Sequence, residues 1–345
     1  MREGFDMFKI VYMDAATPFE RGVQYGQQAK PEIETAIRYY QEKFAKKFTW
    51  DQVLTFAEKF NQATEAFSPE IMDELKGIAA GAGRDVREIM AVNARYEISQ
   101  FDWQHECTTG VFMDPERKKK FIFKNCDLGR SVSHHLVILH IVRPDGFRAL
   151  GVAEAGQLIR DGYNSKGVAL VNSALRSHMD HAGVAVPGTV IRKSVWEASS
   201  FEEACAIQRN RFRTVSTNML LASREGKALD FECYPGGEDE VLPTQGIIGT
   251  GNRFTVDPTR NRAFDPAIDR GRQLKELLAE KRDELDTDTI MEILKNHEGY
   301  PESICRHADD VGHSTVYSII IDLSTNQIYI CFGNPCCNPY QEYQL

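Results

Sequence analysis

The sequence changes character at Cys107, and this change constrains the fold more than any other feature. Before it, the first hundred residues read as helices with apolar residues at helical spacing. Three helix starts carry N-terminal capping signals, at Thr49, Ser68 and Asp85. After Cys107, short apolar runs alternate with turns. We therefore predict a mainly helical segment over 1–106 and a sheet-rich unit over 107–345, joined in one globular body.

The second part of the chain alternates hairpins with helix pairs. Strands are predicted at 107–113, 120–124 and 136–142, followed by Gly-rich turns and more strands on to Asn172. Further strands are predicted at 219–223, 228–233, 245–250, 316–322 and 327–332. Helices are predicted at 189–197, 201–210, 270–281 and 288–296. Antiparallel sheets with helices on their outer faces would bury such elements, so the residues favour an α+β fold.

Two glycines interrupt a helix-like stretch near the N-terminus. Gly22 and Gly26 are spaced by one helical turn, and each costs a helix about 1 kcal/mol relative to alanine. We expect this cost to be offset by close packing against a neighbouring element.

Composition and charge exclude several kinds of partner. The net charge is -9, which disfavours binding to nucleic acid. No apolar run approaches the roughly 18 residues that span a bilayer, and residues 1–13 lack the apolar core of a secretory signal. We expect a cytoplasmic protein with a small-molecule partner and no membrane association. Homo-oligomerisation is left open.

The eight cysteines show no pattern typical of metal or disulfide frameworks. They are scattered without CxxC spacing, so neither a zinc knuckle nor a disulfide scaffold is indicated. His178 and His181 lie three residues apart but lack a third ligand at suitable spacing. We therefore predict no metal and no cofactor. In a reducing compartment, most cysteines simply act as small buried apolar residues.

Cys107 needs a different explanation because it opens the first predicted strand after the helical segment. A thiol attacks a carbonyl well only as a thiolate or with a base beside it. An α-amino group has a pKa of roughly 7.7 to 8.0, so a cysteine at a chain N-terminus carries its own base. Cys107 gains that amine only if the bond to Glu106 is cut. The thiol itself can make the cut through an acyl shift from nitrogen to sulfur.

Eight short motifs, spread over nearly the whole chain, resemble those of a known protein family. The chain resembles the acyl-coenzyme A:6-aminopenicillanate (isopenicillin N) acyltransferase family, a branch of the N-terminal nucleophile hydrolases that is similar to peptidase family C45. The motifs are Glu20–Gly26, Val92–Ile98, Cys107–Thr109, Asn125–Asp127, Gly162–Val168, Gly251–Phe254, His297–Pro301 and Gly333–Pro335.

The resemblance implies a four-layer αββα sandwich of two antiparallel sheets. It also implies self-cleavage before the cysteine, with the fragments 1–106 and 107–345 remaining associated. Acyl transfer would then run through a thioester on Cys107, from a non-peptide amide or an acyl-coenzyme A donor, to water or to an amine.

Three residues receive catalytic roles. Cys107 is the nucleophile and, once freed, its own base. Asp127, near the end of the returning strand, is expected to hold and orient the amine, although it fits a turn residue as well. Asn252 stands where the family has its oxyanion asparagine, and the alternative is a turn asparagine.

Asn172 and Arg253 are the candidate substrate-binding residues. By comparison with distant relatives, Asn172 is expected to make a second polar contact near the acyl group. Arg253 replaces a histidine that is usual in the family and suggests an anionic substrate group.

Two further departures from the family's pattern lie beside the nucleophile. Glu106 replaces the usual glycine at the cleavage site, and Cys126 replaces a common tryptophan. Because glutamate lacks the backbone freedom of glycine, cleavage can be slow or lost. The alternative to an enzyme is therefore an uncleaved binding or scaffold protein of the same shape.

Overall fold

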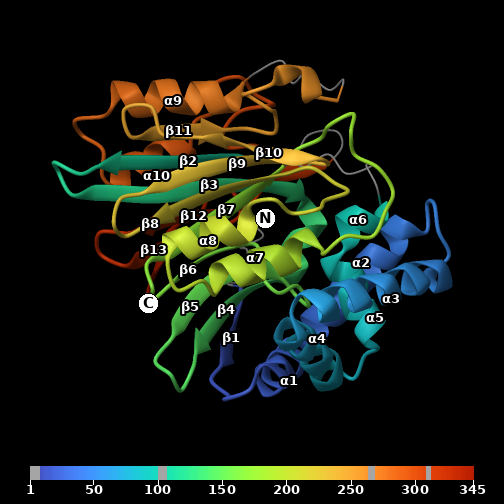
Figure 1. Ribbon diagram of the computed structural model, residues 1–345. Coiled ribbons are helices and arrows are strands. Elements are labelled where there is room, and N and C mark those ends of the chain that lie inside the picture. The colour runs from blue at the N-terminus through green and yellow to red at the C-terminus, as the bar shows by residue number, and fades with distance from the viewer. Residues whose placement is uncertain (1–7, 100–106, 263–268, 308–311) are drawn as a thin grey trace.

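The computed structural model describes residues 8–99, 107–262, 269–307 and 312–345, and its strands form two sheets (Figure 1). The larger sheet has the order β1 (Lys9–Met13), β4 (Leu136–Val142), β5 (Arg148–Glu154), β6 (Asp161–Asn164), β7 (Val168–Ala174), β8 (Thr217–Ser223), β9 (Ala228–Tyr234) and β10 (Gly237–Val241). Neighbouring strands in it are antiparallel except β1, which pairs in parallel with β4.

The smaller sheet carries the start of the sheet-rich part of the chain. Its order is β11 (Ile247–Thr250), β2 (Thr108–Asp114), β3 (Lys119–Gly129), β12 (His313–Asp322), β13 (Gln327–Phe332) and β14 (Tyr340–Gln344). All its pairs are antiparallel. The register sets Thr108 opposite Asn125 and Asp127 opposite Thr315. Both ends of the predicted catalytic hairpin are therefore fixed by ladders of hydrogen bonds.

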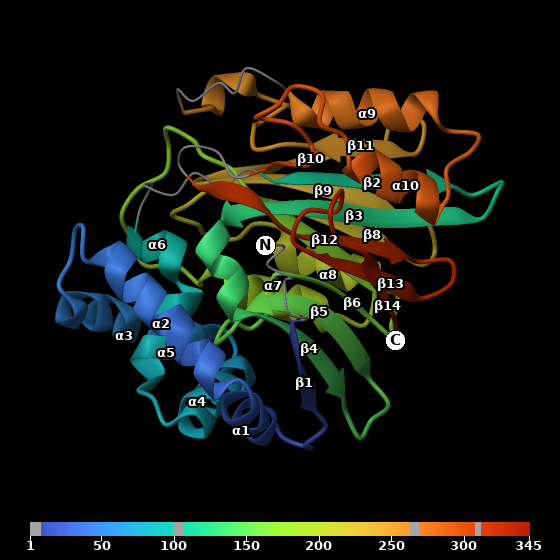
Figure 2. The ribbon, with the colours of Figure 1, turned by 180° about the vertical axis from the view of Figure 1, so that it is seen from behind.

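The two sheets face each other and helices cover their outer faces (Figures 1 and 2). Buried side chains between the sheets include Val111, Ile122, Ile138 and Val171. Helices α9 (Arg270–Glu280) and α10 (Thr287–Leu294) pack on the smaller sheet, whereas α7 (Gly188–Trp196) and α8 (Phe201–Gln208) pack on the larger one. The predicted α+β class and αββα layering are confirmed.

Six helices from the N-terminal segment gather beside the β1, β4 and β5 end of the larger sheet (Figure 2). They are α1 (Pro18–Gln28), α2 (Lys30–Phe44), α3 (Trp50–Phe67), α4 (Pro69–Ala82), α5 (Val86–Asn93) and α6 (Arg95–Ser99). Short 3-10 turns cover Arg130–His135 and Pro258–Arg260. The predicted capping side chains of Thr49, Ser68 and Asp85 each accept a backbone N–H of the following turn. None of the described helices is long and apolar enough to cross a bilayer.

Three strands, β1, β10 and β14, were not predicted: β1 depends on a distant partner, and β10 pairs with the preceding strand β9. β1 lies within a segment expected to be helical, and it pairs with β4, more than a hundred residues later in the chain. β14 pairs with β13 at the edge of the smaller sheet. β1 draws the N-terminal segment into the larger sheet. The division at residue 106 remains a prediction.

Glycines bring helices α1 and α4 into backbone contact, as the spacing of Gly22 and Gly26 predicts. A Cβ atom at Gly22 would lie 2.2 Å from the carbonyl oxygen of Glu74, and one at Gly26 would lie 2.2 Å from that of Ile78. Gly77 faces Phe19 of α1 in the same way, at 2.1 Å. Only glycine fits this contact, which attaches α1 to the rest of the N-terminal segment.

We expect Gly22→Ala to destabilise the protein by about 2 kcal/mol or more, because the clash is with backbone and the two helices must separate. The intrinsic helix preference of alanine recovers only about 1 kcal/mol of this. Gly188→Ala is the matched control, since its Cβ would meet nothing closer than 3.7 Å. Urea unfolding measures both variants. An unchanged midpoint for Gly22→Ala would show that the helices do not pack this closely.

Candidate active site

Cys107 lies directly before β2 and is buried. Its backbone N–H donates to Oδ1 of Asn252 at 2.7 Å. Asn252 follows β11, the neighbour of β2, so the sheet order itself brings the two residues together. Nδ2 of Asn252 donates to the carbonyl oxygen of Ala174 at 2.8 Å, at the end of β7 in the opposite sheet. Asn252 thus bridges the two sheets at the nucleophile.

Asp127 is fully buried near the end of β3 and has two polar partners. Oγ1 of Thr315 donates to its Oδ1 at 2.6 Å, and Nη1 of Arg270 lies 3.4 Å from its Oδ2. Burial raises the pKa of the Asp127 carboxyl to about 8, although Arg270 and the Thr315 hydrogen bond act in the opposite direction. Asp127 therefore readily holds a proton near neutral pH.

Arg270 links Asp127 to Asn252. It stands at the start of α9, is only 3% exposed, and donates through Nη2 to Oδ1 of Asn252 at 3.0 Å. The same guanidinium group therefore contacts both predicted partners of Cys107. An arginine at the start of a helix is ordinarily solvated, whereas Arg270 is buried.

The Cys107 thiol has a lowered pKa. A hydrogen bond with the Cys126 side chain is the main cause and lowers the pKa to about 6. Burial and the charge of Asp127 oppose this shift, whereas the cations Lys124 and Arg160 support it. The pKa of Cys126 is raised instead, chiefly by burial. Cys107 is therefore the thiol of this pair that ionises first.

Alkylation of Cys107 by iodoacetamide should follow a titration with its midpoint near pH 6. Only the thiolate reacts, so the rate rises as pH rises through the pKa and then levels off. Cys205 is the control, because burial raises its pKa to about 11 and it should remain unlabelled. Mass spectrometry of the two peptides gives both rates. A rate at Cys107 that still climbs near the ordinary cysteine pKa of about 8.5 would contradict the shift.

Two cations lie close to the thiol and are held by buried acids. Lys124 of β3 pairs with Asp161 of β6 at 2.8 Å, across the space between the sheets. Asp161 also accepts the backbone N–H of Asn172 at 2.8 Å and the hydroxyl group of Tyr317. These contacts fix the cationic side chains that stabilise a thiolate at Cys107.

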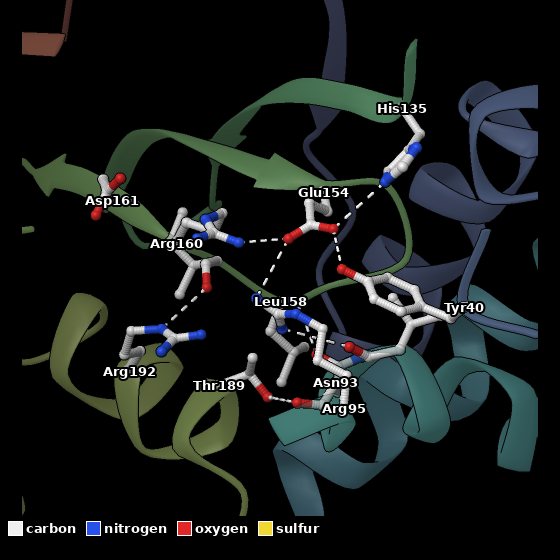
Figure 3. A network of polar contacts seen from close by, with 12 residues as sticks. Tyr40, Asn93, Arg95, His135, Glu154, Leu158, Arg160, Asp161, Thr189 and Arg192 are labelled. Atoms are coloured by element: carbon white, nitrogen blue, oxygen red, sulfur yellow. Dashed lines mark hydrogen bonds and ion pairs between the residues drawn. The ribbon is translucent and has the colours of Figure 1, made fainter. Parts of the chain in front are cut away.

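Glu154 is the centre of a second buried network (Figure 3). Its carboxylate lies 3.2 Å from Arg95 and 3.3 Å from His135, and it also contacts Arg160 and Tyr40. Burial acts to raise the pKa of Glu154, but the neighbouring cations hold it well below its usual range. This network joins the N-terminal helices to β5 and positions Arg160 near Cys107.

A cavity lies beside the site, between the ends of β7 and β8 and helices α5, α6 and α7. Its lining includes Tyr96, Asn172, Ala174, Arg192 and Thr217. Burial, together with Arg95 and Arg160, lowers the pKa of Arg192 to about 10. The described lining does not include Cys107. Ala174 connects the two features, since it lines the cavity and accepts the hydrogen bond from Asn252.

The predicted substrate residues lie in different places. Asn172 lines the cavity, and its side-chain amide, oriented to satisfy its neighbours, donates to the carbonyl oxygen of Arg160 at 3.0 Å. Arg253 is partly exposed and lies 3.6 Å from Asp269. Their substrate roles remain predictions. Glu106, half of the predicted cleavage site, lies outside the described residues.

Arg270 and the thiol pair of Cys107 and Cys126 were not predicted from the sequence. A charged residue at a helix start gives no signal of burial, and Cys126 stood out only as a replacement for a common tryptophan. His178 and His181, the weak metal candidates, each contact a backbone carbonyl oxygen, at 3.2 and 3.1 Å.

Two facing sheets with helices on their outer faces, and a buried thiol at the start of an inner strand, are the features that the family resemblance implies. The sequence pattern of the acyl-coenzyme A:6-aminopenicillanic acid acyl-transferase family matches residues 114–336, well over half of the chain. The chain belongs to this family. The matched region begins after Cys107 and includes Asp127, Asn252 and Arg270.

Solved structures with a similar fold are distant. A variant of the conjugated bile acid hydrolase from Clostridium perfringens is 14% identical, with a TM-score of 0.47 over 69% of this chain and 97% of that chain. An N-acylethanolamine-hydrolyzing acid amidase ortholog from Caenorhabditis elegans is 14% identical, with a TM-score of 0.45 over 63% and 93%. Penicillin V acylase from Agrobacterium tumefaciens is 13% identical, with a TM-score of 0.42 over 66% and 83%. These likenesses do not bear on the reaction of this protein.

Proposed function

We propose that this protein is a self-processing cysteine amidohydrolase or acyltransferase that carries its acyl group as a thioester on Cys107. The observation that carries the proposal is the contact between the Cys107 backbone nitrogen and Oδ1 of Asn252, at 2.7 Å. Cleavage before Cys107 would turn that nitrogen into an α-amino group. A hydrogen-bond acceptor that orients the amine is thus already in position.

The processing step is an intramolecular acyl shift. The Cys107 thiolate attacks the carbonyl carbon of Glu106, the bond from this carbon to the Cys107 nitrogen breaks, and the nitrogen takes up a proton. Water then hydrolyses the resulting thioester and releases a Glu106 carboxylate, the thiol and a free α-amino group. A thiol pKa of about 6 supplies the nucleophile for the first step.

Turnover repeats the same chemistry on an external substrate. The thiolate attacks an amide or thioester carbonyl, and the ammonium form of the freed amine donates a proton to the leaving group. An amide side chain has two N–H donors, and Ala174 engages one of those on Asn252. The second is the proposed donor to the oxyanion. Arg270, which also contacts Asp127, holds Asn252 in place.

The cavity beside the site is the proposed binding region for the acyl group. Asn172 offers it a polar contact and Arg192 a buried cation. Arg95 and Arg160 lie nearby, so this wall favours an acyl group with a polar or anionic atom. A non-peptide amide and an acyl-coenzyme A thioester are the two donor types. Neither requires a cofactor.

Mass spectrometry of the full chain tests the proposal. After incubation with simple N-acyl amides and acyl-coenzyme A donors, we expect acid-quenched protein to carry the acyl group on a fragment that begins at Cys107. Hydroxylamine should remove it, as it removes thioesters. A full-length protein that never gains an acyl group would instead support the uncleaved binding or scaffold protein.

A further inference from the structure

Four metal-binding side chains converge beside β12, outside the Cys107 site. His297, Cys305, His307 and Cys336 each offer one ligand atom, and these atoms lie within 4.8 Å of one another. His297 follows α10, Cys305 and His307 precede β12, and Cys336 follows β13. The connection between α10 and β12 therefore meets the connection between β13 and β14 at one point.

The separations between the ligand atoms are close to the edges of one coordination tetrahedron. The two Nε2 atoms of His297 and His307 are 3.0 Å apart, Nε2 of His307 lies 3.2 Å from Sγ of Cys336, and the sulfurs of Cys305 and Cys336 are 3.6 Å apart. Zinc with ordinary bonds of about 2.0 Å to nitrogen and 2.3 Å to sulfur would separate such atoms by about 3.3 to 3.8 Å. Small movements would admit the ion.

We propose that these four side chains bind a zinc ion in a Cys2His2 site. Two sulfurs and two imidazole nitrogens suit zinc better than magnesium or calcium, which prefer oxygen ligands. Four protein ligands complete a tetrahedron and leave no position for substrate, so the ion is structural. Cys305 is buried, whereas the other three are partly or fully exposed, which gives the ion a route from solvent.

A second layer of contacts orients the buried ligand. Nδ2 of Asn334 lies 3.6 Å from Sγ of Cys305 and donates to the carbonyl oxygen of Arg306 at 2.6 Å. The backbone N–H of Cys305 donates to the carbonyl oxygen of Asn296 at 2.9 Å. Such outer contacts fix the orientation of metal ligands and strengthen metal binding.

The position of the ion connects it to the nucleophile. Arg306, between two of the ligands, donates its backbone N–H to Oγ1 of Thr315 at 2.9 Å. That hydroxyl group donates to Asp127 at 2.6 Å. The zinc ion would therefore hold the segment around Arg306 in place. Arg306 positions the Thr315 hydroxyl group, and this hydroxyl group positions Asp127. Thr315 and the ligands are positioning residues in this scheme.

A disulfide between Cys305 and Cys336 is the competing arrangement. Their sulfurs are 3.6 Å apart, well beyond the roughly 2.05 Å of a disulfide bond, and both thiols are free. A disulfide would also leave the convergence of His297 and His307 unexplained. Zinc accounts for all four side chains at once.

Metal analysis of the untagged full-length protein, purified without chelator, tests the proposal. We expect about one zinc ion per chain. Cobalt added after chelation should show thiolate-to-cobalt charge-transfer absorption and the visible bands of tetrahedral cobalt. Less than a tenth of a zinc equivalent before and after incubation with zinc, or a mass shift that reports a Cys305–Cys336 disulfide, would overturn the proposal.

Three variants separate the site from general damage. Cys305→Ser and His307→Ala should each lose at least ten-fold in zinc affinity, whereas Cys337→Ser should keep the ion. Cys337 is the matched control because it neighbours Cys336 but is outside the group of four. If a ligand variant fails to fold, chelation of the wild-type protein tests whether the zinc ion stabilises the fold. The melting temperature should fall and return with zinc, and a chelator without effect on a zinc-loaded sample would contradict a structural ion. Zinc content does not depend on Cys107, so this test and the acylation test can fail separately.

Discussion

Cys107→Ala should yield a single chain of 345 residues and abolish turnover, whereas the wild type should resolve into fragments of 106 and 239 residues. The thiol is needed twice, first to attack the Glu106 carbonyl and then to accept the acyl group. In a protease where the nucleophile acts with a base, its removal costs on the order of 10⁶-fold in kcat. We therefore expect activity to fall to background. Intact-mass spectrometry and a product assay measure the two effects.

Cys205→Ala is the matched control for this substitution. Cys205 is also a buried cysteine, but it lies in α8 on the outer face of the larger sheet, away from Cys126 and Asn252. The control should keep both cleavage and turnover. Turnover by Cys107→Ala at the wild-type rate would refute the assignment of the nucleophile. If the wild type stays intact yet forms the thioester, only the self-processing step is wrong.

Arg270→Met should lower kcat by at least about 10²-fold and destabilise the fold. Arg270 contacts Asp127 at 3.4 Å and Asn252 at 3.0 Å, and it is buried. Removing the guanidinium group takes a hydrogen-bond donor from two buried side chains, and a buried acceptor left without its partner costs about 1–3 kcal/mol. The pKa of Asp127 should rise further, since Arg270 acts to lower it. Urea unfolding and steady-state kinetics measure the two losses.

Arg272→Met is the control for this second prediction. Arg272 stands on the same helix, is exposed, and pairs with Glu276 at 3.5 Å, so its loss should change stability by less than about 1 kcal/mol. Arg270→Lys should restore part of the activity because it keeps a positive charge without the planar fork of arginine. Combining Arg270→Met with Asp127→Asn should cost less stability than the two single losses added together. Strict additivity would show that the two side chains do not interact.

Much of the fold follows from local sequence signals. The capping side chains at Thr49, Ser68 and Asp85 start helices because each satisfies a backbone N–H group within its own turn. The hairpin of β8 and β9 follows from apolar runs around a short turn, as predicted. β1 could not be predicted in this way. Its partner β4 is remote in sequence, and hydrogen bonds to a remote strand leave no local pattern.

The candidate site was likewise predicted in part from local sequence and decided in part by contacts between distant segments. Sequence alone determined that a cysteine opens the first strand after a helical segment, and family motifs singled out Asp127 and Asn252. In the structure, the side chain of Asn252 contacts the Cys107 nitrogen, and Arg270 links Asn252 to Asp127. The first of these contacts depends on β11 pairing with β2, which joins segments about 140 residues apart.

Tertiary structure alone decided the charges around the thiol and the convergence of four metal-binding side chains. Arg270, Lys124 and Arg160 read as ordinary cations in the sequence, and burial between sheets and helices gives them their effect on Asp127 and Cys107. His297, Cys305 and His307 come from the connection before β12 and Cys336 from the one after β13, so the four show no regular metal-binding spacing. Sequence determined which reactive groups the chain carries. Packing of distant segments decided which of them share a low-dielectric environment, where charges and thiols change one another's chemistry.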